Sequence, residues 1–291
     1  MQKHSEQGKL FLDQKSTQQT KIGQATVDYH QASTILTPGK GFLSSYDYSL
    51  NPYSGCSFGC NYCYAAFFAF SKASKDNWGH WVKVKDNALK LLVKRRKKPL
   101  IDKTIYLSSV TDPYQPIERS LQLTRQVLQE LLDYHEVKLV VQTRSPLVTR
   151  DIDILQKFET VQVNMTITTD DEKVRKAFEP WCPSNANRLE AITSLHQSGI
   201  ESCITMTPLL PVNDASQFAK VLKATGVQKF IVQNFHLEKG KFVANTRADA
   251  LKMVEKMQWT PQRYAETVAI FREHLPTLTE GKDGFSADKI T

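Results

Sequence analysis

The strongest restriction on the fold comes from a repeated alternation between short β-branched runs and longer helical patterns. The β-branched runs are Lys103–Ser109, Val137–Thr143, Val161–Ile167, Ile200–Met206 and Gln228–Asn234. Segments with helical periodicity lie among them, at Ser120–Tyr134, Asp151–Phe158, Asp170–Phe178, Asn187–Gln197 and Ala215–Thr225. Strands that alternate with helices in this way are typical of βα units around a parallel sheet, so the sequence predicts an α/β fold.

A further βα unit precedes this series, because a strand near Tyr46–Pro52 is followed by a helix from about Tyr64. The total of six units is fewer than the eight of a complete βα barrel. In parallel βα folds, the side chains that bind or react gather at the carboxyl ends of the strands. The segments at those ends are rich in hydroxyl groups, carboxylates, His and Arg, which favours an enzyme.

The chain divides into three regions by composition. Residues 1–40 are rich in Gln, Ser, Thr and Lys and are expected to form a polar N-terminal extension, in part disordered or wrapped on the surface. Residues 41–240 carry the βα units. Residues 241–291 begin with a segment, 247–275, that predicts one or two covering helices, and they end in a polar tail, Thr279–Thr291, that we expect to be loose.

Composition limits the class of protein and its partners. A hydrophobic content of 41% is enough for a globular core. No apolar run is long enough to span a membrane, and the N-terminus lacks the apolar core of a signal peptide, so we expect a cytoplasmic protein with reduced thiols and no membrane partner. The net charge of +8 favours a polyanionic partner such as nucleic acid. The densest basic run, Lys94–Lys98, also fits the exposed carboxyl end of a helix at Asp86–Lys97.

Three of the five cysteines lie within one short stretch, "NPYSGCSFGCNYCYA". Cys56, Cys60 and Cys63 have the spacing C-x3-C-x2-C, and a glycine precedes each of the first two. Glycine allows a tight turn that wraps a loop around one inorganic cluster. A 4Fe–4S cluster held only by protein takes four thiolates, so three leave one iron open to a small molecule. A structural zinc with His80 as fourth ligand, or a thiol–disulfide pair within "CNYC", are the alternatives.

This loop and the segments around it resemble a known family. The cysteine spacing, with Tyr62 directly before the third cysteine, resembles the signature of radical S-adenosylmethionine enzymes. Four further blocks resemble the spore photoproduct lyase-like branch of that superfamily: "TDPYQPIERSLQLTR", "QTRSPLVTRDIDIL", "ITTDDEKVRKAFEP" and "RLEAITSLHQSGI". The resemblance implies a partial (β/α)6 TIM-type barrel with an N-terminal extension and C-terminal covering helices.

The resemblance also implies a mechanism and a metal site. Cys56, Cys60 and Cys63 would ligate a 4Fe–4S cluster whose fourth iron takes the amino and carboxylate groups of S-adenosylmethionine. One electron, supplied by a reducing partner of the flavodoxin or ferredoxin type, would split the cofactor into methionine and a 5′-deoxyadenosyl radical that abstracts hydrogen from the substrate.

Five further residues match positions that contact the cofactor in the family. Tyr62 matches the aromatic residue near the adenine, and Thr111 and Asp112 match the contacts to the cofactor's amino end. Arg144 would face the methionine carboxylate, where its guanidinium can form two parallel hydrogen bonds. Thr166 falls where a hydroxyl meets the ribose or the carboxylate. Each of these residues also suits a purely structural role in capping a strand end or pairing a surface charge.

One position departs from the spore photoproduct lyase pattern. In that enzyme a cysteine in the loop after the second strand returns a hydrogen atom to the repaired thymine, but the matching stretch here, Leu107–Pro116, has no cysteine. Thymine-dimer repair by that route is therefore not expected. Cys182 lies in a predicted loop and is a candidate hydrogen donor, whereas Cys203 falls in mid-strand, where a buried thiol is usual.

Two functions follow as hypotheses. The first is a radical S-adenosylmethionine enzyme that modifies or repairs a substrate, with nucleic acid preferred because of the basic charge and the family's DNA-repair member. The second is a non-catalytic nucleic-acid-binding module with a structural cluster or zinc. The sequence does not indicate an oligomeric state.

Overall fold

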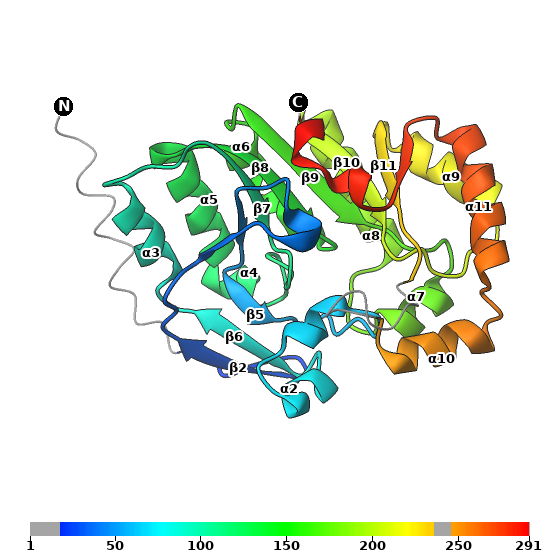
Figure 1. Ribbon diagram of the computed structural model, residues 1–291, viewed down its shortest axis with the longest axis horizontal. Helices are drawn as coiled ribbons and strands as arrows, with labels where there is room; N and C mark the ends of the chain where they lie inside the picture. Colours follow the sequence, from blue (N-terminus) through cyan, green and yellow to red (C-terminus); the bar gives the residue numbers. More distant parts are fainter. Residues whose placement is uncertain (1–17, 236–245, 291) are drawn as a thin grey trace.

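The computed structural model describes residues 18–235 and 246–290 and contains two β-sheets (Figure 1). The larger sheet has the strand order β12-β11-β10-β9-β8-β7-β4-β3. Its strands are β3 (Leu36–Pro38), β4 (Tyr48–Leu50), β7 (Ile101–Leu107), β8 (Glu136–Thr143), β9 (Thr160–Thr166), β10 (Glu201–Met206), β11 (Lys229–Val232) and β12 (Leu278–Glu280). The predicted extension up to residue 17 and part of the loop after β11 lie outside the described residues.

The six strands β4 and β7 to β11 are parallel to one another, which confirms the predicted series of βα units, whereas β3 pairs with β4 in the antiparallel direction. Within the described residues the sheet remains open, with β12 and β3 at its two edges, so it forms part of a barrel and does not close. The connecting helices are α3 (Ala88–Arg95), α4 (Glu118–Leu121), α5 (Leu123–Tyr134), α6 (Ile152–Leu155), α7 (Glu172–Phe178), α8 (Asn185–Gln197) and α9 (Ala215–Ala224). A 3-10 segment, η3 (Pro146–Asp151), leads into α6.

The side-chain pattern of the strands explains the layers. In β8, Leu139 and Val141 join the large core shared with the helices, whereas Val140, on the other face, belongs to a second cluster inside the curved sheet.

Helix starts follow the capping residues of the sequence. The side chains of Asp171 and Asp214 accept backbone N–H bonds at the starts of α7 and α9.

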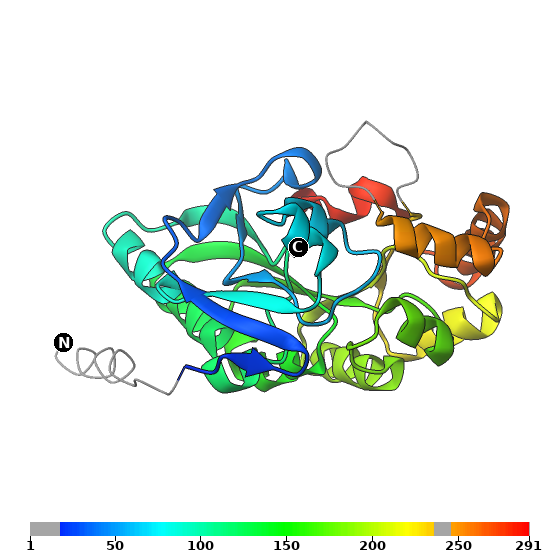
Figure 2. The ribbon, with the colours of Figure 1, turned by 90° about the horizontal axis from the view of Figure 1, so that it is seen from below.

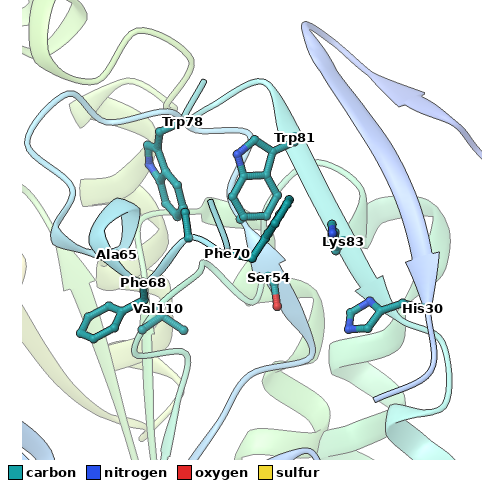
Figure 3. A pocket seen from close by; sticks show the side chains of 11 residues that line it. His30, Ser54, Ala65, Phe68, Phe70, Trp78, Trp81, Lys83 and Val110 are labelled. Atoms are coloured by element: carbon teal, nitrogen blue, oxygen red, sulfur yellow. The ribbon is translucent and has the colours of Figure 1, made fainter. Parts of the chain in front are cut away.

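The smaller sheet has the order β1-β2-β6-β5 and comprises β1 (Lys21–Ile22), β2 (Ala25–His30), β5 (Tyr53–Gly55) and β6 (Trp81–Lys85). Val27 of β2 and Val82 of β6 are buried in the large core. Trp81 and Lys83 alternate with the buried residues and lie on the opposite face (Figure 3). In Figure 2, the blue and cyan strands of this sheet lie in front of the larger sheet. The described end of the predicted extension, residues 18–40, therefore contributes strands to both sheets.

The C-terminal region contains α10 (Ala248–Lys256) and α11 (Pro261–His274), as predicted, and then a packed tail. The expectation of a loose tail is wrong for residues up to 290. After β12 the tail forms two 3-10 turns, η4 (Gly281–Phe285) and η5 (Ala287–Lys289), drawn in red in Figure 1. Phe285 and Ala287 are buried against Tyr106, Val140 and Cys203 inside the curved sheet. A few apolar side chains spread through a polar segment give no clear periodic signal, which explains the wrong expectation.

A membrane-crossing helix is not found among the described residues, since none of their helices combines the necessary length and apolar character.

Candidate active site

The three clustered cysteines lie on the loop that leaves β5, next to the carboxyl ends of the larger sheet. Gly55 and Gly59 both have positive φ angles, of 74° and 60°. A Cβ atom at Gly59 would lie 2.3 Å from the ring of Trp181, so a larger residue fits neither the backbone nor the space. The predicted role of these glycines in turning the loop agrees with this geometry.

Polar side chains from distant segments hold this loop in place. Gln115 accepts a hydrogen bond from the backbone N–H of Ser57 at 3.0 Å, and Gln24 donates to the carbonyl of Ser57 at 2.7 Å. Asn61 donates through its backbone and side chain to the carbonyls of Phe178 and Ala177, both at 2.8 Å. These contacts define the backbone path between the cysteines without help from a ligand.

The thiols are shielded from water to different degrees. Cys56 and Cys60 are buried and Cys63 is half-buried. Burial raises the pKa of the Cys56 thiol, and it raises that of Cys63 to about 11. Burial acts in the same direction on Cys60, but the contact with Cys182 and the charge of Arg144 outweigh it and lower the pKa. Cys60 is thus the thiol of the three that the protein prepares most for the thiolate form.

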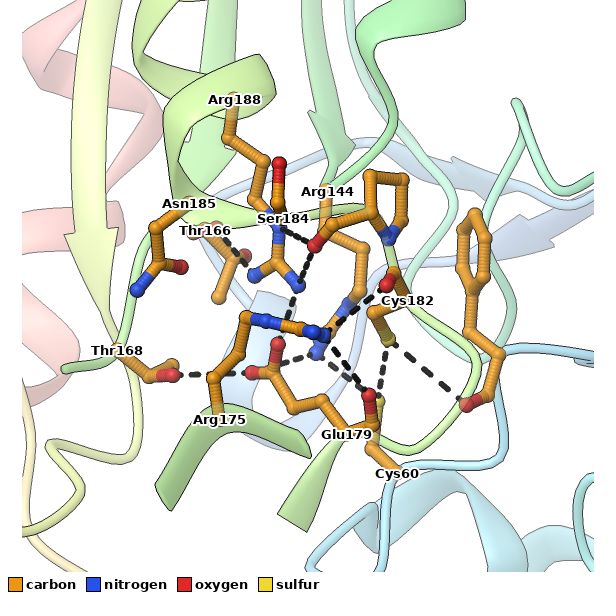
Figure 4. Close-up of polar contacts among 12 residues, drawn as sticks. Cys60, Arg144, Thr166, Thr168, Arg175, Glu179, Cys182, Ser184, Asn185 and Arg188 are labelled. Atoms are coloured by element: carbon orange, nitrogen blue, oxygen red, sulfur yellow. Dashed lines mark hydrogen bonds and ion pairs between the residues drawn. The ribbon is translucent and has the colours of Figure 1, made fainter. Parts of the chain in front are cut away.

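Arg144 extends from the end of β8 to the cysteine loop (Figure 4). Its Nη1 lies 2.9 Å from Cys60 Sγ, 2.7 Å from the Tyr62 hydroxyl and 3.3 Å from Glu179 Oε1. The sequence singled out Arg144, Tyr62 and Cys60 separately, and the structure brings them into one contact. Glu179 was not predicted as a site residue.

Glu179 is the centre of what we call the Glu179 cluster: Glu179, Arg144, Arg188 and Tyr62. The carboxylate is fully buried, pairs with Arg188, and accepts hydrogen bonds from Tyr62 at 2.5 Å and Thr168 at 2.9 Å. Burial alone raises the pKa of Glu179, but the charges of Arg188 and Arg144 prevail and bring it to about 2. Two guanidinium groups therefore face one carboxylate, and the cluster carries an excess positive charge beside the thiol of Cys60.

Arg175 and Cys182 complete this side of the site (Figure 4). Arg175 is buried and donates to the backbone carbonyls of Glu179 at 3.1 Å and Cys182 at 3.0 Å. The thiol of Cys182 is buried 3.5 Å from Cys60 Sγ. Glu179 and Arg188 both fall in sequence blocks that resemble the family, but their pairing depends on a contact that only the fold creates.

Asp112 and Thr111 lie in the loop after β7. The Asp112 carboxylate accepts hydrogen bonds from Thr143 Oγ1 at 2.8 Å and from the backbone N–H of Tyr114 and of Arg144, both at 2.9 Å. It therefore holds the backbone that carries Arg144. Thr111 Oγ1 donates to the carbonyl of Gly55 at 2.6 Å, at the start of the cysteine loop. Their predicted contact with a cofactor stays a prediction.

Thr166 lies at the end of β9 in a buried polar layer. Its hydroxyl lies 3.1 Å from that of Thr205 and accepts a hydrogen bond from Gln142 at 2.8 Å. Gln142 belongs to the "QTRS" block, and sequence reasoning passed over it. Because the polar side chains of β8, β9 and β10 meet at the strand ends, this layer lies on the side of the sheet where parallel βα folds bind their ligands.

A second set of buried charges, the Glu118 cluster, lies where α4 meets η3. It comprises Glu118, Arg150, Asp151 and Tyr53. Arg150 donates to Glu118 Oε1 and to Asp151 Oδ1, each at 2.8 Å, and the Tyr53 hydroxyl donates to Glu118. Burial raises the pKa of Glu118, and the hydrogen bonds to it compensate only in part. Arg125 also pairs with Asp151 and with the exposed Asp153, each at 2.8 Å, so two arginines meet three carboxylates and neither arginine lacks an anion here.

The donor set fits an iron–sulfur cluster. Three thiols lie on one loop of defined shape, and each would bind a different iron. Among residues 18–235 and 246–290, no three His, Cys, Asp or Glu side chains are placed to hold one metal ion. Three thiols on one loop match such a cluster in ligand type and in number.

Comparisons with known proteins were made for sequence and for fold. A protein of Methanocaldococcus jannaschii, described as uncharacterised, is 37% identical over 164 residues, which cover 56% of this chain and 61% of that protein. An uncharacterised protein of Acidianus two-tailed virus is 28% identical over 68% of this chain and 70% of its own length. The chain thus matches less than two thirds of the archaeal relative.

The structural comparison points to one enzyme fold. Spore photoproduct lyase in complex with a dinucleoside spore photoproduct superposes with a TM-score of 0.60 at 15% identity, covering 88% of this chain and 81% of that one. A variant of that enzyme with bound S-adenosylmethionine gives a TM-score of 0.57 at 14% identity, with the same coverage. The family model for the radical SAM superfamily matches residues 50–224, more than half of the chain. The chain therefore belongs to the radical SAM superfamily, and its fold is that of a radical SAM enzyme.

Proposed function

We propose that this protein binds a 4Fe–4S cluster through Cys56, Cys60 and Cys63 and uses it to cleave S-adenosylmethionine reductively. The chemistry that such a cluster supplies is one-electron cleavage of the sulfonium to methionine and a 5′-deoxyadenosyl radical, which takes hydrogen from a substrate. The observation that carries the proposal is the three-cysteine loop, shaped by Gly55 and Gly59, directly beside the excess positive charge of the Glu179 cluster.

The protein's own groups would stabilise the ligated thiolates. Thiolates bind metal only after losing a proton, and burial of Cys56 and Cys63 opposes that loss. The charge of Arg144 lowers the pKa of Cys60 and partly offsets the effect of burial at Cys63, because its half-buried guanidinium, paired with Glu179, lies 2.9 Å from Cys60 Sγ. Thiolates would then neutralise the excess positive charge of the Glu179 cluster. This charge supports the binding of an anionic group, such as a thiolate-ligated iron–sulfur cluster, beside Arg144.

The same guanidinium suits the carboxylate of S-adenosylmethionine. Glu179 and Tyr62 hold Arg144 Nη1, which sets the orientation of the planar group. Asp112 fixes the backbone N–H of Arg144 and thereby its position at the end of β8. We assign Tyr62, Thr111, Asp112, Arg144 and Thr166 to the cofactor pocket, with Asp112 acting at least in part through the backbone that it holds.

We propose nucleic acid as the substrate class, because the chain carries a net charge of +8 and resembles in fold an enzyme solved with a dinucleoside. The electron would come from a reducing partner of the flavodoxin or ferredoxin type. Cys182 is the candidate hydrogen donor, since its thiol lies 3.5 Å from Cys60 Sγ, next to the loop that would hold the cluster.

The decisive experiment is anaerobic reconstitution with iron and sulfide, followed by reduction with dithionite in the presence of S-adenosylmethionine. We expect a brown protein with about four irons per chain that releases 5′-deoxyadenosine and methionine. Product that forms only with reductant and only with loaded protein would support the proposal. Loaded protein that leaves S-adenosylmethionine intact under reduction would refute catalysis.

The alternative, a binding module with structural zinc or a structural cluster, predicts a different outcome. Protein purified without oxygen would be colourless and would contain zinc, or it would be brown with every iron ligated by side chains. Electron paramagnetic resonance of the reduced protein separates these cases, because addition of S-adenosylmethionine changes the spectrum only where one iron is open to it.

A further inference from the structure

A pocket of about 270 Å³ opens on the outer face of the smaller sheet, beside the cysteine loop (Figure 3). Its walls include Trp78, Trp81, Phe68, Phe70, Lys83 and His30. The volume lies just below the range of about 300–1,000 Å³ usual for small-ligand pockets. The pocket is therefore of a size for one flat ring system rather than for a whole cofactor.

The aromatic rings of the pocket are held at steep angles to one another. The centroids of Trp81 and Phe70 lie 5.3 Å apart at 73°, and those of Trp78 and Trp81 lie 5.7 Å apart at 86°. Trp81 Nε1 donates to the carbonyl of Ser74 at 2.8 Å, which fixes the plane of its ring. Phe70 is 65% exposed although the ammonium group of Lys83 lies over its ring, and Phe68 is 55% exposed, so both rings keep surface open to a ligand.

Positive charge accompanies these rings. Lys83 Nζ lies 3.6 Å from the centroid of the Phe70 ring and has no carboxylate partner within the described residues. The pKa of His30 is lowered by burial and, after that, by the charges of Lys85 and Lys83. A neighbouring hollow of about 430 Å³, which also borders Phe70 and Lys83, contains the acidic residue Asp28. The first pocket has no acidic residue in its wall.

The pocket shares a wall with the candidate active site. Gly55, directly before Cys56, and Ala65, two residues after Cys63, both line it. Val110, from the loop at the carboxyl end of β7, closes it on the side of the larger sheet. A ligand bound here therefore lies at the edge of the face from which the cysteines and Arg144 act.

We propose that this pocket binds an unstacked base of single-stranded nucleic acid, with the adjoining phosphate on Lys83. The inference rests on the proposed function in taking nucleic acid as the substrate class, and it adds the surface that holds the strand. Aromatic faces that accept any base, next to a cation for the backbone, are the elements from which proteins bind single strands.

The test measures the affinity of the reconstituted protein for a short fluorescein-labelled oligothymidylate, as DNA and as RNA, by fluorescence anisotropy. Phe70→Ala and Phe70→Leu should each weaken binding about tenfold or more, since one stacked base is lost. The leucine variant keeps an apolar side chain, so it separates loss of stacking from a general disturbance. Lys83→Glu should also weaken binding and should lower the salt dependence by about one phosphate contact.

Matched controls lie elsewhere on the surface. Tyr134 is also an exposed aromatic residue with a cation, Arg96, over its ring at 3.4 Å, but it belongs to α5. Tyr134→Ala, and Lys220→Glu on the exposed side of α9, should leave the affinity within about twofold. An abasic oligonucleotide of equal charge should bind the wild-type protein about tenfold more weakly, and Phe70→Ala should remove that difference.

Equal affinity of the Phe70 variants and the wild type, or equal affinity for the abasic strand, would overturn the inference. The inference would also be overturned if Phe70→Ala bound the oligonucleotide normally but was reduced more slowly by flavodoxin. The surface would then bind an electron donor and not a nucleic acid. The proposed function is tested separately by cleavage of S-adenosylmethionine by the wild-type protein without nucleic acid. Failure of that reaction with normal oligonucleotide binding would refute catalysis and leave the binding site in place.

Discussion

Two fully buried glutamates, Glu179 and Glu118, occupy clusters that share the same kinds of partner. Each accepts a hydrogen bond from a tyrosine hydroxyl and pairs with an arginine. Their pKa shifts nevertheless have opposite signs. Burial raises both, but two arginines bring the pKa of Glu179 to about 2, whereas that of Glu118 stays raised.

The difference lies in the balance of charge. In the Glu118 cluster, Arg150 is matched by Glu118 and Asp151, and Arg125 pairs with Asp151 as well. In the Glu179 cluster, Arg144 and Arg188 share one carboxylate. A further carboxylate, that of Asp112, meets Arg144 at its backbone N–H and not at its guanidinium, so an anion that faces the guanidinium would complete the second arrangement. The Cys60 thiol, 2.9 Å from Arg144, lies where that anion would be. We infer that the Glu118 cluster is structural and that the Glu179 cluster is prepared for a ligand.

The largest expected effect comes from removing the Cys60 thiolate, which would be the anion that faces Arg144. Cys60→Ala should reduce the iron bound after reconstitution to near zero and abolish cleavage of S-adenosylmethionine, because three thiolates are needed and one is gone. Iron analysis and the visible absorbance spectrum measure this. Cys203→Ala is the matched control, since Cys203 is buried in β10 and should leave the iron content unchanged. Full iron loading of the Cys60 variant would contradict the assignment.

Neutralising each glutamate in turn compares the clusters directly. Glu118→Gln should change the free energy of unfolding by less than about 1 kcal/mol and leave the iron content unchanged, because burial already disfavours the charged form of Glu118. Glu179→Gln should lower the free energy of unfolding by about 3 kcal/mol, because folding favours the charged form of Glu179, and it should also reduce iron loading, since Arg144 is no longer held. Urea unfolding and iron analysis are the measurements. Equal iron loading in both variants would remove the functional distinction.

Replacing one arginine of each cluster with lysine should have a smaller effect on cofactor binding and on stability. Arg144→Lys keeps the charge but loses the planar fork, so binding of S-adenosylmethionine to the loaded protein should weaken about tenfold, a difference of about 1.4 kcal/mol. Arg150→Lys should lower stability by about 2 kcal/mol and leave that affinity unchanged. Equilibrium dialysis and urea unfolding separate the two results. Weaker cofactor binding in the Arg150 variant would argue against a purely structural Glu118 cluster.

The smallest expected effect is on how stability depends on pH. The stability difference between the wild type and each glutamate variant should change with pH in opposite directions for Glu118 and Glu179. Glu118 has a raised pKa when folded, so the wild type should gain stability relative to Glu118→Gln as the pH falls from 7 toward the ordinary value of 4.5. Glu179 has a lowered pKa, so the wild type should keep a constant advantage over Glu179→Gln down to about pH 4.5 and lose it between 4.5 and about 2. Urea unfolding at several pH values measures both differences. Parallel curves for the two variants would contradict the assigned shifts.

Local patterns predicted much of the site. The spacing of Cys56, Cys60 and Cys63 is a property of eight consecutive residues, and the glycines that turn the loop are part of the same stretch. The strands were predictable from their β-branched runs, since both faces of a parallel strand are buried. Arg144 was identified from the resemblance of its block to the family, and that block also follows a strand at the end where ligands bind.

Glu179, Arg188, Gln142 and Gln115 were missed, since no local pattern marks a buried partner. The contact of Arg144 with Cys60 joins residues 84 positions apart, and that of Cys182 with Cys60 joins residues 122 apart. The packed tail was missed for the same reason, because Phe285 finds its neighbours on strands from the middle of the chain.

The amino-acid sequence by itself determined the α/β class, the parallel strands and the three-thiol loop, because these depend on side-chain periodicity and on short-range backbone geometry. The tertiary structure alone decided which buried charges are balanced and which are not. Charge balance depends on distances between side chains, and only the folded chain brings Arg144, Arg188 and Glu179 together beside Cys60. The aromatic pocket on the smaller sheet is of the same kind, since its walls come from several segments that the fold assembles.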